Sequence, residues 1–262
     1  MDYIFIIVAA TLASGLTMFS GFGLGTLLLP VFALFLPVEI AIAATALVHF
    51  FNGIFKAVLL GKMADKGLVL RFGLPAIIAA FGGVYVLTLL SGMTEIWTYS
   101  LFGKQAVITP IKLIIALLMA VFATIELHPR FAKMEINRRW ILLGGLLSGF
   151  FGGLSGHQGA LRSAFLAKVG ISPQSFVGTN AIIGLLVDMA RLVAYGAILV
   201  GARFSAITHN HEVGLVASGV IAAFCGVMLG KRFLHKVTMI TIQQITGCLL
   251  LVVALLLGLG II

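Results

Sequence analysis

Charged residues are scarce in this chain: aspartate, glutamate, lysine and arginine together make up 10% of its 262 residues. Soluble globular domains carry about 25%. A soluble protein must also expose part of its surface to water, which a chain that is 61% hydrophobic cannot easily do. The mean hydropathy of +1.20 instead fits a surface that faces lipid. The shortage of charge therefore argues against an ordinary soluble protein and predicts an integral membrane protein.

Cysteine is also rare, and the two present, Cys225 and Cys248, fall inside apolar runs. A thiol in such a run usually behaves as a small hydrophobic group, so neither cysteine indicates a redox compartment. The chain starts without the positive n-region of a cleavable signal, and we expect the first apolar stretch to belong to the mature protein. No glycine-lysine loop of the P-loop type occurs, and we expect no cofactor and no metal.

Ten apolar segments follow one another between polar breaks, at 3–19, 21–36, 38–60, 70–91, 106–125, 141–154, 158–170, 174–200, 213–230 and 241–261. A helix of about 20 apolar residues can cross the ~30 Å hydrocarbon core of a bilayer. Four segments, the first two and those at 141–154 and 158–170, are short or interrupted, and they form two pairs with a glycine-rich turn in each. This pattern predicts an all-α, multi-pass membrane protein in which the short pairs either span the bilayer or form re-entrant hairpins.

Lysine and arginine are distributed unevenly among the loops. Three loops hold ten of them: Lys62, Lys66, Arg71, Arg130, Lys133, Arg138, Arg139, Lys231, Arg232 and Lys236. The opposite loops hold only Lys104, Lys112 and Arg203. The positive-inside rule therefore predicts that the basic loops are cytoplasmic and that both termini are extracytoplasmic. A positive-inside pattern also makes a nucleic-acid partner unnecessary to explain the formal charge of +9.

The two short pairs open two similar halves. Matches at offsets of 134 to 136 are Ser14-Gly15 with Ser148-Gly149, Ser20-Gly21 with Ser155-Gly156, Gly25 with Gly159, Pro37 with Pro173, and Gly83 with Gly219. Each half has five segments, an odd number, so the second half is predicted to be inverted. We expect one transmembrane domain, 1–262, with repeat one at 1–126, a cytoplasmic linker at 127–139 and repeat two at 140–262. Secondary transporters often have this plan, with the binding site where the broken helices meet.

The glycine-rich turns are the first candidates for that site. Their residues are Ser20, Gly21, Gly23 and Gly25 in the first turn, and Ser155, Gly156, His157, Gln158, Gly159 and Arg162 in the second. A broken helix offers backbone N–H groups and a positive dipole end to an anion. Arg162 lies deep in its segment, where a charge usually faces a cavity; a structural bond to helix-end carbonyls is the alternative. For His157 the alternatives are proton coupling and a structural hydrogen bond.

Other glycines before the second turn, Gly144, Gly145, Gly152 and Gly153, are expected to allow close helix packing. The long segment after each pair carries a polar stripe. The first stripe is Thr45, His49, Asn52 and Lys56, spaced 4, 3 and 4, and the second is Asn180, Asp188, Arg191 and Tyr195, spaced 8, 3 and 4. Residues spaced in this way share one helical face.

These stripes supply the remaining candidates. Thr45, Asn52 and Asn180 are candidates to line a midplane cavity, and His49, Lys56, Asp188 and Arg191 are candidates for coupling or gating. As alternatives, Lys56 extends to the cytoplasmic end of its helix, and Arg191 pairs with Asp188 one turn away. Because cations outnumber the single buried acid, the site favours a small anion.

In this order, the motifs resemble those of the TauE/SafE sulfite exporters, also called the 4-toluene sulfonate uptake permease family (TSUP). The resemblance covers essentially the whole chain and rests on Ser20-Gly-Phe-Gly-Leu-Gly with Pro30 and Pro37, on Ala41 to Thr45, and on Gly152 to Gly159 with Gly178-Thr179-Asn180. It implies ATP-independent transport of sulfite, sulfoacetate or a related anion across the cytoplasmic (inner) membrane. In the second turn, His157-Gln158 replaces the small residues usual in the family.

Two other functions use the same residues. A passive anion channel needs the same basic cavity. An intramembrane serine protease is suggested by Gly153-Leu-Ser-Gly156, which matches the rhomboid Gly-x-Ser-Gly pattern. A serine nucleophile needs a base, yet His157 is only two residues from Ser155 and the later histidines fall in loops. We therefore expect a transporter and no enzyme, with a small anion and the lipid bilayer as partners, and leave open whether the chain forms a homodimer.

Overall fold

The computed structural model describes residues 2–16, 24–101, 104–128, 137–166, 169–202, 210–233 and 239–262. Its main helices are α1 (Asp2–Leu16), α2 (Leu24–Ala33), α3 (Val38–Leu60), α4 (Lys66–Leu68), α5 (Leu74–Ser91), α6 (Pro110–Leu127), α8 (Ile141–Ser155), α9 (Gln158–Leu166), α10 (Pro173–Ala202), α11 (Asn210–Phe233) and α12 (Met239–Gly258). A π-helical turn, η2 (Val69–Gly73), joins α4 to α5, and the 3-10 turns η1 (Gly61–Met63) and η3 (Arg138–Trp140) follow α3 and precede α8. Strands β1 (Trp97–Leu101) and β2 (Lys104–Ile108) form an antiparallel hairpin.

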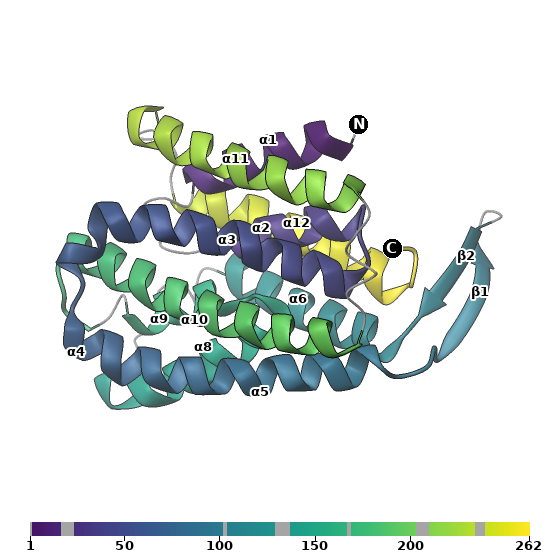
Figure 1. Ribbon diagram of the computed structural model, residues 1–262, viewed down its shortest axis with the longest axis horizontal. Coiled ribbons are helices and arrows are strands. Elements are labelled where there is room, and N and C mark those ends of the chain that lie inside the picture. The colour runs from purple at the N-terminus through teal and green to yellow at the C-terminus, as the bar shows by residue number, and fades with distance from the viewer. Residues whose placement is uncertain are drawn as a thin grey trace.

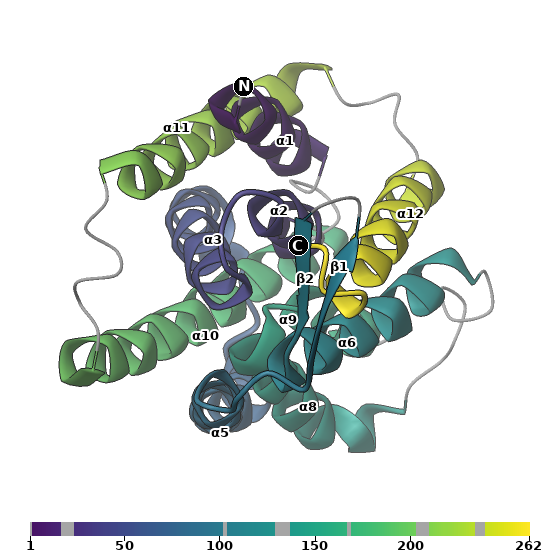
Figure 2. The same ribbon diagram turned by 90° about the vertical axis from the view of Figure 1, so that its right-hand side faces the viewer.

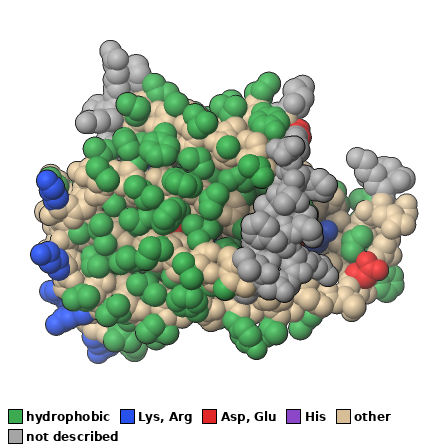
Figure 3. Space-filling model, in the orientation of Figure 1, with side chains coloured by type: hydrophobic (Ala, Val, Ile, Leu, Met, Phe, Trp, Pro, Cys, Tyr) green, Lys and Arg blue, Asp and Glu red, His purple; other side chains and the backbone are tan. Residues whose placement is uncertain are grey.

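Each predicted apolar segment contains one of these helices, with α4, η2 and α5 running as a single helix. Within the described residues, three runs are long and apolar enough to cross a bilayer: Val38–Met63, Lys66–Ser91 and Pro173–Ala197. At about 1.5 Å per residue, the ten residues of α2 extend about 15 Å, half of the ~30 Å hydrocarbon core. Hydrophobic side chains cover the visible face of the molecule, and Lys and Arg gather at one end (Figure 3). The prediction of a membrane protein built from apolar helices is confirmed.

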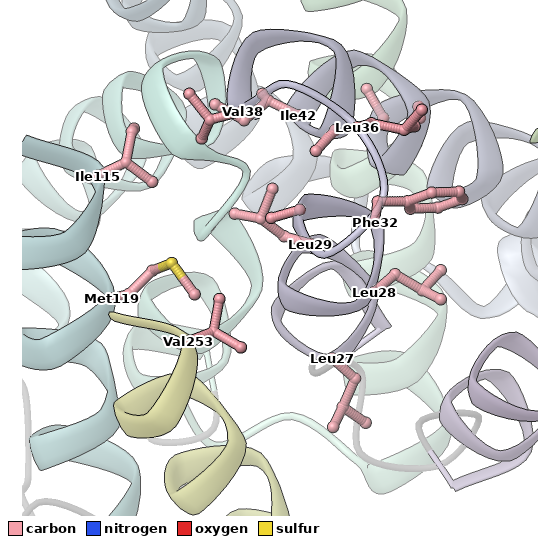
Figure 4. Packing of buried hydrophobic residues seen from close by; sticks show 14 of the residues in the cluster. Leu27, Leu28, Leu29, Phe32, Leu36, Val38, Ile42, Ile115, Met119 and Val253 are labelled. Atoms are coloured by element: carbon pink, nitrogen blue, oxygen red, sulfur yellow. The ribbon is translucent and has the colours of Figure 1, made fainter. Parts of the chain in front are cut away.

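The helix α2 lies inside the bundle, between α1, α3 and α12 (Figures 1 and 2). Nine of its ten residues are buried, as expected for a helix that is apolar on every side. Its side chains pack against neighbours from α3, α6 and α12, including Ile42, Met119 and Val253 (Figure 4). This packing holds the first residues of α2, Leu24 and Gly25, at the centre of the molecule.

Glycines bring α5 and α8 into backbone contact. Three glycines of α8 meet three backbone carbonyls of the continuous η2–α5 helix in the same order along both helices: Gly145 at Phe72, Gly149 at Ala76 and Gly153 at Ala80. The two helices are therefore parallel, and a Cβ at any of these glycines would overlap the facing carbonyl. Gly144 and Gly152 face the Phe165 ring and the Gln158 side chain in the same close way. The prediction that the glycines before the second turn serve helix packing is confirmed.

Two further pairs of helices run antiparallel. Along α3 and α10, Gly53 faces Leu185 whereas Gly61, later in the chain, faces the earlier Ile182. Along α6 and α12, Gly247 faces Ala123 whereas Gly258, later in the chain, faces the earlier Ala116. By contrast, α1 and α11 are parallel, and their most extensive partners are each other.

The β-hairpin differs from the predicted all-α architecture. It projects from one end of the bundle (Figure 1), with Trp97 paired to Ile108 and Leu101 to Lys104. The last residues of the chain pack on it: Val107 N–H donates to the Gly260 carbonyl at 3.0 Å, and the Tyr99 hydroxyl to the Leu259 carbonyl at 2.6 Å. Aromatic and β-branched residues favour such strands, but the predicted apolar segment 106–125 included three of the five residues of β2.

Candidate functional site

The break between α8 and α9 is built on Gly156. This residue ends α8 with a positive φ of 80° and donates its N–H to the Gly152 carbonyl at 3.0 Å. Glycine is the residue that adopts this conformation without strain. The Ser148 hydroxyl then donates to the Gln158 carbonyl at 2.9 Å, which ties the start of α9 back to α8. The predicted interruption at the second turn is confirmed.

Asp188 of α10 is the hub of a buried polar network. Its Oδ1 accepts hydrogen bonds from Gln158 Nε2 at 2.7 Å and Arg191 Nε at 3.0 Å, and Arg191 Nη2 lies 2.7 Å away. Its Oδ2 pairs with His49 Nδ1 of α3. Asp188 and Arg191 are fully buried. One carboxylate thus links α3, α9 and α10.

Arg191 and Tyr195 connect this network to the end of α8. Arg191 Nη1 donates to the Gly152 carbonyl at 3.1 Å, and the Tyr195 hydroxyl donates to the Gly153 carbonyl at 2.7 Å. The Gly152 carbonyl thus accepts from Arg191 as well as from the Gly156 N–H. The Gly153 carbonyl is one of the last four of α8, which lack a regular partner within a helix, and Tyr195 satisfies it. Arg191 therefore pairs with Asp188, which is the structural alternative stated for it above. Arg191 also donates to a carbonyl at the end of a helix, the role that was the alternative for Arg162.

Arg162 is held by side chains of α9 and α10. It is 1% exposed, donates from Nε to Asn180 Oδ1 at 2.8 Å, and donates from Nη1 to Gln158 Oε1 at 2.9 Å. Its guanidinium lies against Gly184, where a Cβ would come within 3.1 Å of both terminal nitrogens. Asn180 is itself fixed, because its Nδ2 donates to the Phe176 carbonyl at 3.1 Å. The chain thus positions Arg162 rigidly inside the bundle.

A small cavity of about 20 Å³ adjoins this guanidinium. The residues that line it come from α3, α9 and α10: His49, Asn52, Gly53, Lys56, Arg162, Val177, Asn180, Ala181, Gly184 and Leu185. Such a volume holds about one water molecule. On the α3 side, Asn52 Nδ2 donates to Ser14 Oγ at 2.5 Å, and Ser14 in turn donates to the Ala223 carbonyl at 2.7 Å. The cavity is polar on the sides formed by α3 and by Arg162 and Asn180.

His157 occupies the turn itself and is fully buried. Its ring stacks on Phe122 of α6, with 4.8 Å between centroids and 4° between planes. Nδ1 lies 3.0 Å from Ser155 Oγ, while Nε2 has no hydrogen-bond partner in the described part of the chain. This unpartnered nitrogen is a buried polar group that a ligand can satisfy.

The contact between His157 and Ser155 is closer than their spacing in the sequence led us to expect. The Ser155 hydroxyl donates to the Phe151 carbonyl of its own helix at 3.0 Å. Its single proton is then directed to that carbonyl and not to His157 Nδ1, where a general base would have to receive it. The geometry therefore does not assemble a serine–histidine pair for proteolysis.

The sequence candidates that lie within the described residues fall into three groups. Eight form the connected polar region: His49, Asn52, Lys56, Gln158, Arg162, Asn180, Asp188 and Arg191. Ser155, Gly156, His157 and Gly159 form the adjoining turn, and Gly25 reaches it, since a Cβ there would lie 3.2 Å from the Gly156 carbonyl. Thr45 is buried, but its hydroxyl donates to Ala41 of its own helix at 2.7 Å, and it does not line the cavity.

Three candidates of the first turn, Ser20, Gly21 and Gly23, lie outside the described residues. Sequence reasoning also missed two contributors, Ser14 and Ser148. Both had been recognised as equivalent positions in the two halves, and both are fully buried with their hydroxyls bonded to another helix or to the turn. A serine inside an apolar run was the available signal.

Comparison with known proteins agrees with this architecture. No curated protein and no solved structure matches the chain. The family model described as "Sulfite exporter TauE/SafE" matches residues 6–257, which extends from α1 to α12 and includes the whole polar network. This is a family of membrane transporters, so the protein is not an enzyme. On this evidence the chain belongs to the TauE/SafE sulfite exporter family.

Proposed function

We propose that this protein is a secondary transporter that exports sulfite or a related small sulfur-containing anion across the cytoplasmic membrane by alternating access. Family membership supports an anion exporter in general. The observation that carries the proposal is the buried network between α3, α9 and α10, in which Lys56, Arg162 and Arg191 accompany the single carboxylate of Asp188. Charges at membrane depth are costly and usually serve a transport pathway.

We place the anion in an enlarged form of the cavity beside Arg162. Arginine and lysine form short, charge-assisted hydrogen bonds to oxyanions, and the cavity combines Arg162 and Lys56 with the amides of Asn52 and Asn180. A sulfite ion has one sulfur and three oxygen atoms, whereas about 20 Å³ holds about one water. Entry of the anion therefore requires α3 and α10 to separate, which is the movement that alternating access provides.

The second turn completes the proposed site. The start of α9 offers backbone N–H groups at the second turn, and His157 Nε2 in that turn is a buried polar atom without a hydrogen-bond partner in the described part of the chain. Gly25, at the start of α2, approaches the Gly156 carbonyl closely, which supports a contribution of the first glycine-rich turn to the same site. In this proposal the two turns contact one side of the anion and Arg162 the other.

The pairing of the helices supports two inverted repeats, 1–126 and 140–262. With the segments matched in order, α3 corresponds to α10 and α6 to α12, and each of these pairs is antiparallel. In the same matching, α5 corresponds to α11 and α8 to α1. The parallel pair α5–α8 therefore has an equivalent in the parallel pair α11–α1. A pseudo-two-fold axis in the membrane plane produces this arrangement, and it relates the repeats of many secondary transporters.

Counterflow in proteoliposomes tests the proposal. Vesicles that contain the purified protein and unlabelled sulfite are diluted into labelled sulfite, and uptake is compared with sulfate, sulfoacetate, thiosulfate and aryl sulfonates as competitors. A carrier gives saturable uptake that internal substrate accelerates, and we expect sulfite or one of the sulfonates to compete best. A linear, non-saturating conductance without counterflow would show a passive anion channel instead.

A further inference from the structure

A second basic site lies at the end of the bundle away from the β-hairpin, where Lys and Arg side chains gather (Figures 1 and 3). It is a surface cavity of about 550 Å³. Its lining residues come from the start of the α4–α5 helix and from the segment that leads into α8: Asp65, Gly67, Leu68, Arg71, Arg138, Arg139, Ile141 and Leu142. None of them belongs to the network around Asp188.

The fold brings three arginines and two helix starts together in this cavity. The α4–α5 helix begins after Asp65, whose carboxylate accepts from Leu68 N–H at 2.9 Å, and the η3–α8 helix begins after Asn137, whose side chain accepts from Arg139 N–H at 3.0 Å. Because α5 and α8 are parallel and in backbone contact, both N-termini lie at this end. The positive ends of both helix dipoles add to the charges of the arginines.

These arginines have no carboxylate partner in the described part of the chain. The ion pairs there join Asp188 to His49 and to Arg191. Arg71, Arg138 and Arg139 are all exposed, and Arg139 lies 5.3 Å from the centre of the Trp140 ring. A cavity with three such guanidinium groups favours a ligand with a phosphate or another polyatomic anion.

The surroundings of the cavity identify the source of the anion. Both helices that form the cavity carry exposed apolar side chains: Leu70, Leu74 and Ile78 on the α4–α5 helix, and Leu142, which lines the cavity itself, on α8. Trp140, 45% exposed, follows Arg139 in the chain and its ring lies against that guanidinium; tryptophan is enriched where a membrane protein meets the lipid–water interface. A soluble anion has no use for such a surface, whereas the acyl chains of a lipid do.

We infer that this cavity binds the phosphate headgroup of an anionic phospholipid, whose acyl chains lie along α5 and α8. The orientation predicted from the basic loops puts the lipid in the cytoplasmic leaflet, which carries the anionic lipids that attract such clusters. The site is separate from the proposed anion pathway, so the inference does not depend on the transported substrate.

Binding to defined lipids tests this inference. Detergent-purified protein is titrated with phosphatidylglycerol or with zwitterionic phosphatidylcholine, and bound lipid and melting temperature are measured by native mass spectrometry and thermal shift. The variant Arg71→Gln/Arg138→Gln is compared with Lys62→Gln/Lys66→Gln, which loses the same charge at the same end outside the arginine cluster. We expect phosphatidylglycerol to bind preferentially, and the arginine variant to bind it about 25-fold more weakly, about fivefold for each arginine.

Three results would overturn the inference. Equal binding of the two lipids would show that the headgroup charge is not recognised. Equal weakening by the two double variants would show attraction to general surface charge. Full competition by soluble glycerol phosphate would show a site for a free anion. If the arginine double variant does not fold, the single variants Arg71→Gln and Arg138→Gln give the same comparison with Lys62→Gln.

Discussion

Arg162 and Arg191 lie within the same buried network but have different surroundings. At the scale of single residues, this difference indicates that one arginine is placed to bind the anion and the other to hold the helices in position. Arg191 contacts the carboxylate of Asp188 and a helix-end carbonyl. Arg162 contacts the amide oxygens of Gln158 and Asn180 and lines the cavity. We therefore assign Arg162 to the anion and Arg191 to the support of α8.

Replacing Arg162 tests this assignment. We expect Arg162→Gln to lower the affinity for sulfite at least tenfold, because charge-assisted hydrogen bonds contribute about 1.5–3 kcal/mol each and about 1.4 kcal/mol corresponds to a factor of ten. Binding is measured by thermal shift and uptake in proteoliposomes, with Lys62→Gln as a charge-matched control that is expected to behave as wild type. A folded Arg162→Gln protein with unchanged binding and uptake contradicts the assignment.

Asp188 and Arg191 are expected to stabilise the fold as a pair. Asp188→Asn leaves the buried Arg191 without its carboxylate, and Arg191→Gln leaves Asp188 with His49 and Gln158 but without its arginine. Breaking a buried pair costs up to about 3–5 kcal/mol in the free energy of unfolding. The double variant removes both charges, so we expect its loss to be clearly smaller than the two single losses added together. The free energies of unfolding of the wild type, the two single variants and the double variant are measured in mixed micelles and compared as a double-mutant cycle. Additive losses would mean that the two side chains act independently.

At the scale of elements, the contact between α5 and α8 depends on the absence of a side chain at Gly149. We expect Gly149→Ala to destabilise the protein by about 1–3 kcal/mol, because the new methyl group overlaps the Ala76 backbone and overpacked sites cost this much. Gly196→Ala in α10 is the matched control: a Cβ there meets nothing within 4 Å of the described structure. It should leave stability unchanged or raise it slightly. Equal melting temperatures for the two variants would contradict the packing account.

Element positions could be read from the sequence because apolar runs with polar breaks define membrane helices directly. The same helical spacing placed His49, Asn52 and Lys56 on one face, and that face does point to the cavity. The spacing within α10 also predicted the Arg191 partner of Asp188, but its partners on other helices, His49 and Gln158, could not be read in this way. They depend on how the α8–α9 turn docks on α10, and a spacing within one helix contains no information about docking.

The hairpin shows a second limit of sequence reasoning. Five residues from Trp97 to Leu101 alternate too briefly to give a clear strand signal, and Ala106-Val107-Ile108 reads as the start of the next apolar segment. Only the pairing of the two strands distinguishes them from a helix end. Each of these two strands is too short to be predicted from its own sequence, and they are identified as strands only because they pair in the structure.

On the scale of the whole molecule, the concentration of Lys and Arg at one end predicts the orientation in the membrane. In a background with Cys225→Ala and Cys248→Ala, we expect a membrane-impermeant maleimide to label Ser100→Cys on intact cells. Lys62→Cys, at the opposite end, should be labelled only after permeabilisation. The cysteine-free parent is the control, and the reverse pattern would invert the predicted topology.

The contact between the hairpin and the end of the chain has a mechanical consequence. The hairpin lies between α5 and α6, in the first half, whereas Leu259 and Gly260 follow α12, in the second. These hydrogen bonds therefore act as a tether across the two halves at one end of the bundle. If the halves rock against each other, that end is a pivot and the opposite end travels further, so the hairpin sets which side of the protein opens more widely.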